Sequence, residues 1–245
     1  MDGTFLQLAV FLGATFVAAV VVGVSGFAFA LIAAAAWLHV LTPLQTATLT
    51  IGYGMLVQSY GAWKLRHAVS WPRIWPFLLG GAPGVAIGVF VLRWANPAHI
   101  RAGVGAFLVL YALYGLTRPT LKPVPAGRVA DAGVGFLSGM LGAMTGFAGI
   151  LIVIWSGLRG WSRDIQRGVF APASVALLGM CALAIGVTGS VARETVQLFL
   201  LGLPVLVAGN WVGFKLYGRL DEAGFRRIVL ILLLASGVPL IATLR

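Results

Sequence analysis

Two four-residue motifs combine a hydroxyl group and a glycine within apolar sequence. They are Ser25-Gly26-Phe27-Ala28 and Thr145-Gly146-Phe147-Ala148. Glycine allows the backbone to turn and to approach a ligand closely. A helix that restarts after such a break presents amide N–H groups and a positive dipole end, and the hydroxyl can cap a helix or donate to an oxyanion. The motifs therefore predict a site for a small anion, although close packing of helices through small residues would need no ligand.

Polar residues at the starts of later apolar segments extend this candidate site. Gln45 and Gln166 occupy matching places, and each can donate to an anion without carrying charge or bond to a neighbouring helix. Thr46 and Thr48 stand beside Gln45. The predicted substrate-binding residues are Ser25, Gly26, Phe27, Gln45, Thr46, Thr48, Thr145, Gly146, Phe147 and Gln166.

The acidic residues and histidines are poorly placed for catalysis. All of them fall near the ends of apolar segments or in loops, and they form no carboxylate pair, metal-ligand spacing or nucleophile triad. A cation-driven carrier usually has an acidic residue well inside the membrane. We therefore expect neither an enzyme nor a cation transporter, and no metal or cofactor. The residues concerned are Asp2, Asp131, Asp164, Glu194, Asp221, Glu222, His39, His67 and His99.

The composition predicts a membrane protein. Hydrophobic residues make up 60% of the 245 residues and charged residues only 9%, against about 25% charged in ordinary soluble domains. The net charge of +11 could suggest nucleic acid, but the basic residues lie in short gaps between long apolar runs, as in the loops of a membrane protein. The single cysteine, Cys181, excludes an intrachain disulfide.

Apolar runs long enough to cross a bilayer recur along the chain, which predicts an all-α polytopic protein with about eight to ten hydrophobic segments. The runs after the two motifs, 26–41 and 147–158, are short, and each either crosses the membrane or pairs with its predecessor as a hairpin. The segments are 5–22, 26–41, 44–63, 74–93, 99–117, 128–144, 147–158, 168–190, 194–216 and 225–244. Thirteen of the 17 Lys and Arg residues then fall on one side, which we expect to be cytoplasmic, with both termini periplasmic or extracellular.

The chain resembles itself at an offset of about 120 residues. Besides the two motifs, Gln45 matches Gln166, and Pro83 and Gly88 match Pro204 and Gly209. We therefore expect a first membrane repeat at 1–117, a cytoplasmic linker at 118–127 and a second repeat at 128–245. Five segments in each half would give the halves opposite orientations, as in many secondary transporters, with broken or short helices at the glycine-rich motifs.

The sequence resembles the sulfite exporter TauE/SafE family of permeases along nearly its whole length. The stretches that carry the resemblance are Gly23-Val24-Ser25-Gly26-Phe27, Gly139-Met140-Leu141-Gly142-Ala143-Met144-Thr145-Gly146-Phe147-Ala148-Gly149 and Trp161-Ser162-Arg163-Asp164-Ile165-Gln166-Arg167. Many relatives have a richer glycine run at the first break, so details of the site transfer more directly to the second half. The resemblance implies movement of sulfite, sulfonates or related small anions across a bacterial cytoplasmic membrane.

We therefore predict an alternating-access transporter for a small sulfur-containing anion, sulfite or an organosulfonate such as sulfoacetate, in the bacterial inner membrane. A carrier for another small organic anion and an anion channel are the alternatives. The expected partners are the anionic substrate and membrane lipids, with no nucleic acid, and a homodimer is left open. Arg159, Arg163 and Arg167 recur every fourth residue, and they can contact lipid headgroups or form an electrostatic funnel for anions.

Overall fold

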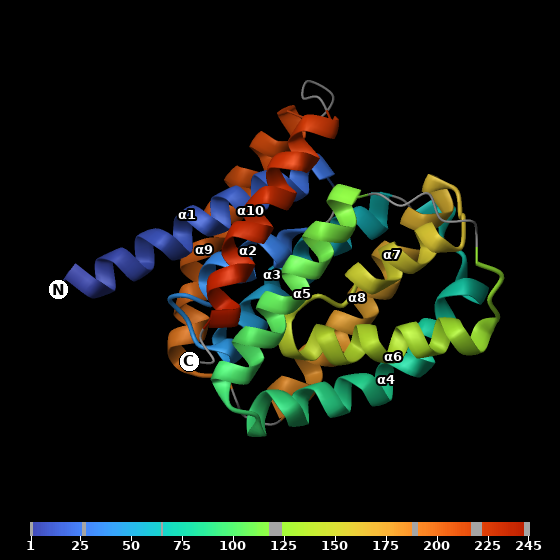
Figure 1. The fold of residues 1–245 in the computed structure, drawn as a ribbon, viewed down its shortest axis with the longest axis horizontal. Coiled ribbons are helices and arrows are strands. Elements are labelled where there is room, and N and C mark those ends of the chain that lie inside the picture. Colours follow the sequence, from blue (N-terminus) through green and yellow to red (C-terminus); the bar gives the residue numbers. More distant parts are fainter. Residues whose placement is uncertain are drawn as a thin grey trace. The chain divides into compact units, whose positions relative to one another are not determined.

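The computed structural model describes residues 2–25, 28–64, 66–117, 124–187, 191–216 and 222–242. Within these ranges the chain forms α-helices, one short 3₁₀ helix and no strand (Figure 1). The helices are α1 (Asp2–Ser25), α2 (Phe29–Trp37), α3 (Pro43–Lys64), η1 (Arg66–Ala68), α4 (Trp71–Trp94), α5 (Pro97–Thr117), α6 (Arg128–Thr145), α7 (Ile150–Leu158), α8 (Arg163–Val187), α9 (Arg193–Leu216) and α10 (Glu222–Ala242).

Helix lengths follow the predicted repeat in part. The two short helices, α2 and α7, have nine residues each, and each follows directly after one of the two motifs. The fourth helices of the two halves, α4 and α9, have 24 residues each, and the fifth, α5 and α10, have 21 each. The first helices, α1 and α6, have 24 and 18 residues, and the third, α3 and α8, have 22 and 25. The lengths therefore agree at the second, fourth and fifth helices, and the division into two repeats stays a prediction. The predicted linker at 118–127 separates α5 from α6, and residues 124–127 of it are described.

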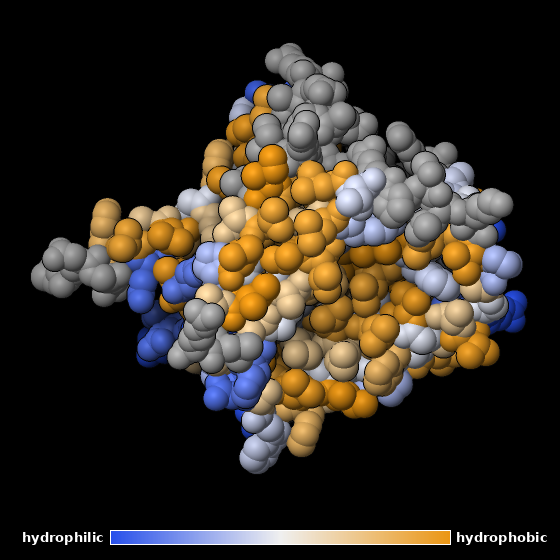
Figure 2. All heavy atoms as spheres, viewed as in Figure 1, coloured by the Kyte–Doolittle hydropathy of each residue, from blue (hydrophilic) through white to orange (hydrophobic). Residues whose placement is uncertain are grey.

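Five of the described helical segments are long and apolar enough to cross a membrane. They are Phe5–Val24, Trp71–Trp94, Pro97–Thr117, Gly168–Val187 and Arg193–Leu216. Many large apolar side chains are exposed on them, Phe90 and Leu110 among others, and Figure 2 shows apolar residues over much of the visible face. Such a surface is stable only against lipid. The chain is therefore an all-helical, polytopic membrane protein, as predicted.

The helices pack into two compact units that do not coincide with the two halves of the sequence. The first unit comprises Met1–Thr46, Ala95–Pro119 and Arg193–Arg245, and the second comprises Ala47–Trp94 and Thr120–Ala192. The first unit thus holds α1, α2, α5, α9 and α10, whereas the second holds α4, α6, α7, α8 and most of α3. Each unit therefore takes helices from both halves of the sequence.

The fourth helix of each half packs against the first helix of the other half. In the second unit α4 lies along α6, and in the first unit α9 lies along α1. Glycines make both approaches close: a Cβ on Gly84 would lie within 3.0 Å of the Phe136 backbone, and a Cβ on Gly213 within 3.0 Å of the Val20 carbonyl oxygen. In lipid, such packing through small residues is a main source of helix association. In both units, therefore, the fourth helix of one half of the sequence packs against the first helix of the other half.

Candidate functional site

The second motif ends α6 in a tight, buried turn. Gly146 follows the last residue of α6 in the left-handed conformation, with φ 81°, and its N–H donates to the carbonyl oxygen of Gly142 at 2.8 Å. Only glycine adopts this conformation without strain. Thr50 of α3 occupies the space that a side chain on Gly146 would need, since a Cβ there would lie within 3.0 Å of the Thr50 side chain. Two independent constraints therefore require glycine at position 146.

The hydroxyl group of Thr145 holds this turn together. Its Oγ1 donates to the carbonyl oxygen of Leu141 at 2.6 Å and accepts the N–H of Phe147 at 3.2 Å. The carbonyl oxygen of Thr145 in turn accepts a hydrogen bond of 2.8 Å from Oγ1 of Thr50. Thr145, Gly146 and Phe147 are all buried. The structure thus brings these three predicted residues together, and the threonine side chain shapes the backbone of the break.

Helix α7 restarts after the turn without a side-chain cap, and the N–H of its first residue, Ile150, donates to the carbonyl oxygen of Phe147 at 3.3 Å. Its N-cap residue is Gly149, and no described side chain forms a cap hydrogen bond there. The N–H groups in the first turn of a helix have no partner inside the helix, and they form its positive end. The N–H groups of Leu151 and Ile152, which follow Ile150 in this first turn, are the donors that could face a ligand, and their contact with an anion stays a prediction.

Two residues of this region escaped the sequence analysis. Thr50 is fully buried against the break, and Ser174 of α8 is 1% exposed beside Gly149. Neither belongs to a motif. At the offset of 121 that aligns the two predicted glutamines, Thr50 matches Ala171 and Ser174 matches Tyr53, so the repeat gave no paired signal. Ser174 stands out only as a single hydroxyl among apolar residues of its helix.

Gln45 and Gln166 bond locally, each at the start of a long helix. Oε1 of Gln45 accepts the N–H of Thr42 at 3.1 Å, and Oγ1 of Thr42 accepts the N–H of Gln45 at 3.2 Å, which is a reciprocal cap of α3. Nε2 of Gln166 donates to the carbonyl oxygen of Trp161 at 2.8 Å. Each glutamine therefore stabilises the connection that follows a short helix, and a contact with a ligand stays a prediction. Thr46 and Thr48 lie in the first turns of α3, buried and half-buried respectively.

The first motif is only partly described. Ser25 is the last residue of α1, while its side chain, and Gly26 and Phe27 entirely, lie outside the described residues. Their predicted role in binding is therefore untested. Ala28, the N-cap of α2, has φ 78°, a left-handed conformation that is unfavourable for a residue with a Cβ. In the repeat Ala28 corresponds to Ala148, two positions after the left-handed Gly146.

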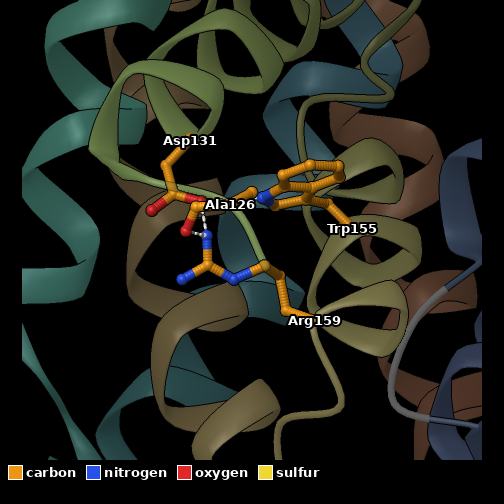
Figure 3. A network of polar contacts seen from close by, with 4 residues as sticks. All are labelled: Ala126, Asp131, Trp155 and Arg159. Carbon is orange, nitrogen blue, oxygen red and sulfur yellow. Dashed lines mark hydrogen bonds and ion pairs between the residues drawn. The ribbon is translucent and has the colours of Figure 1, made fainter. Parts of the chain in front are cut away.

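A polar network attaches the far end of α7 to the beginning of α6 (Figure 3). Nε1 of Trp155 donates to Oδ1 of Asp131 at 2.7 Å, and Nη1 of Arg159 lies 3.2 Å from the same oxygen. Arg159 also donates to the carbonyl oxygen of Ala126. Asp131 lies in the first turn of α6 and Arg159 caps the end of α7, so α7 runs back along α6. The two helices form an antiparallel helical hairpin, a geometry that a fully crossing α7 and a partly crossing α7 share.

The same network accounts for part of the basic cluster. Arg159 is bonded to Asp131 within the protein, and its guanidinium lies 5.5 Å from the ring centroid of Trp161. The guanidinium of Arg73 in α4 lies 5.3 Å from the same centroid. The side chains of Arg163 and Arg167 lie outside the described part of the chain. Arg159 therefore has a structural role in this ion pair, in addition to the two roles predicted for the cluster, contact with lipid headgroups or an electrostatic funnel for anions.

The described residues contain no group of three His, Cys, Asp or Glu side chains placed to hold a metal ion.

Comparison with known proteins assigns the chain to a family. The chain matches no curated protein and no solved structure. The model of one family, described as sulfite exporter TauE/SafE, matches residues 11–240, which is nearly the whole chain. The chain therefore belongs to the sulfite exporter TauE/SafE family.

Proposed function

We propose that this chain is a secondary transporter that moves a small sulfur-containing anion, either sulfite or an organosulfonate such as sulfoacetate, across the bacterial cytoplasmic membrane. The observation that carries the proposal is membership of the sulfite exporter family over residues 11–240. Family membership supports transport of sulfite or a related anion. The identity of the substrate is the finer part of the proposal.

The break between α6 and α7 supports an anionic substrate. It offers N–H groups at the positive end of a helix, next to a buried glycine turn that Thr145 and Thr50 hold in place. We place the substrate at this break, in contact with Gly146 and Phe147. The corresponding residues of the first half, Ser25, Gly26 and Phe27, and the residues that follow the short helices, Gln45, Thr46, Thr48 and Gln166, complete the proposed set.

Alternating access is the proposed mechanism. Repeats of opposite orientation are common in transporters that open to the two sides of the membrane in turn, and each compact unit here contains helices of both halves. The excess of Lys and Arg on one side supports a cytoplasmic location for the loops that contain Arg73 and Arg159. Both termini would then face the periplasm or exterior of the cell.

Counterflow in liposomes tests the proposal. Purified protein would be reconstituted in vesicles loaded with sulfite, and uptake of labelled sulfite would be measured against unlabelled sulfite, sulfoacetate, acetate and phosphate as competitors. We expect saturable exchange that sulfite and sulfoacetate inhibit. Exchange that only acetate inhibits would favour a carrier for another organic anion. A large electrical conductance without counterflow would favour an anion channel.

A matched pair of variants tests the location of the site. Thr145 and Thr15 are both buried, and Oγ1 of each donates at 2.6 Å to the carbonyl oxygen four residues earlier. Only Thr145 borders the break. Thr145→Val removes the two hydrogen bonds that hold the backbone of the break, so we expect it to raise the sulfite concentration for half-maximal exchange by about tenfold, and Thr15→Val to leave it unchanged. Equal effects of the two substitutions would refute this location.

A further inference from the structure

Ser174 carries a buried hydroxyl group with no partner. The residue lies in the middle of α8 and is 1% exposed, and its Oγ forms no hydrogen bond with any described residue. Buried polar atoms in native proteins are nearly always hydrogen-bonded. A hydroxyl in this condition points to a partner that the chain itself does not provide.

Three other buried hydroxyl groups bond to their own helix, whereas the hydroxyl of Ser138 in α6, like that of Ser174, has no partner among the described residues. Oγ of Ser156 in α7 donates to the carbonyl oxygen of Val153 at 3.0 Å, and Thr15 and Thr145 donate to carbonyl oxygens four residues earlier. Ser174 makes no such bond among the described residues. Its hydroxyl is therefore available to a ligand, whereas theirs are occupied.

The Ser174 hydroxyl lies beside the uncapped start of α7. A Cβ on Gly149, the N-cap of α7, would lie within 3.0 Å of Oγ of Ser174 and of the Phe170 ring. The backbone of Gly149 is in an ordinary conformation, with φ −96°, so glycine is needed here for space and not for backbone geometry. The absence of a side chain leaves the serine hydroxyl against Gly149, the residue directly before the first turn of α7.

We infer that Ser174 Oγ and the amide groups of the first turn of α7 form one oxyanion subsite in the second unit. The hydroxyl would donate to one oxygen of the anion while the helix N–H groups donate to another, and the positive end of α7 would stabilise the charge. The ligand class is a compact oxyanion, such as sulfite or the sulfonate group of sulfoacetate. This inference rests on the proposed function and names the residues that would hold the anionic group.

Ser174→Ala tests the inference, with Ser156→Ala as the matched control. Both serines are buried in the second unit, but only Ser174 lies at the start of α7. Binding of sulfite, sulfoacetate, acetate and phosphate to detergent-solubilised protein would be measured by isothermal titration calorimetry. We expect Ser174→Ala to weaken sulfite and sulfoacetate binding by about tenfold or more, and Ser156→Ala to change it less than about twofold.

A second variant guards against misfolding. Ser174→Cys keeps nearly the same volume and offers a weaker donor, so we expect an affinity between those of the wild-type protein and Ser174→Ala. Size-exclusion profiles and melting temperatures without ligand would establish that each variant is folded. The graded order Ser, Cys, Ala is expected from a hydrogen bond to the ligand and not from a buried water or a packing role.

The outcomes separate this inference from the proposed function. Sulfite binding to Ser174→Ala as tight as to the wild-type protein would overturn the subsite and leave the proposed transport intact. If the wild-type protein bound acetate or phosphate but no sulfur anion, and Ser174→Ala lost that binding, the subsite would stand and the proposed substrate would fall. Binding of none of the four anions would overturn both.

Discussion

Each of the two short helices, α2 and α7, is attached to the helix before it by a tryptophan indole N–H. The acceptor is a backbone carbonyl for α2 and a carboxylate for α7. Nε1 of Trp37 in α2 donates to the carbonyl oxygen of Phe11 in α1 at 3.2 Å, and Nε1 of Trp155 in α7 donates to Oδ1 of Asp131 in α6 at 2.7 Å. Phe11 and Asp131 differ by 120 in number, which is the offset of the repeat. An indole N–H thus bonds each short helix to the equivalent position of its predecessor.

The surroundings of the two tryptophans differ. Trp37 is fully buried, with its ring centroid 5.1 Å from that of Phe11. Trp155 is half-buried and shares a carboxylate with Arg159. The two tryptophans differ by 118 in number, so the acceptor positions are equivalent in the repeat and the donor positions are not. The first hairpin is held mainly by apolar packing and the second partly by an ion pair. The second hairpin contains the Gly146 turn, which suits it to the proposed binding role.

Replacing the buried tryptophan should give the largest effect. Trp37→Ala removes a fully buried ring and should lower the free energy of unfolding by about 3–5 kcal/mol. Trp155→Ala should cost about half as much, because part of that ring is already exposed. Equilibrium unfolding in mixed micelles would measure both. A larger loss for Trp155→Ala would contradict the contrast between a packed and a polar attachment.

Gly146→Ala should have the next largest effect. The substitution forces an alanine into a left-handed conformation, at about 1–2 kcal/mol, and crowds Thr50, at about 1–3 kcal/mol. We expect a total loss of about 2–5 kcal/mol in the same unfolding measurement. Gly133→Ala is the control, since it lies in α6 with no atom within 4 Å of its Cβ position. This control should be neutral or slightly stabilising.

Loss of the carboxylate charge should have a moderate effect. Asp131→Asn keeps an oxygen for the Trp155 indole but removes the ion pair with Arg159, and it should cost about 1–2 kcal/mol. Glu194→Gln is the control, because Glu194 is exposed in the first turn of α9, and it should cost less than about 0.5 kcal/mol. Unfolding at low and high salt would compare them. Equal costs would show that the Asp131 charge acts only through the helix dipole.

Relief of backbone strain at Ala28, in the first break, should change the free energy of unfolding least. Ala28→Gly removes a left-handed strain of about 1–2 kcal/mol, offset by about 0.5–1 kcal/mol for the greater backbone freedom of glycine in the unfolded chain. We expect a net stabilisation of about 0.5 kcal/mol, opposite in sign to the effect of Gly146→Ala. A melting temperature clearly below that of the wild-type protein would show that the Ala28 methyl group has a packing role.

Much of the candidate site was predictable because its residues break an otherwise apolar pattern. The Thr145-Gly146-Phe147 turn was predicted from residue types, and the structure places it at the end of α6 as a buried break. The local bonds of Gln45 and Gln166 were not predicted, since they depend on the conformation of the connecting loops, and contact of these residues with a ligand stays a prediction. Thr50 and Ser174 were missed because their importance arises only from the packing of α3 and α8 against the break.

The sequence by itself determined the class of protein, the order of long and short helices, the positions of the two breaks and the family. These properties follow from hydropathy, segment length and short motifs, all of which are local along the chain. Only the tertiary structure decided that α4 packs on α6 and α9 on α1, and that Ser174 lies beside Gly149. Such contacts join residues that are distant in sequence, and apolar helices in lipid choose their partners by the fit of small residues, which hydropathy does not encode.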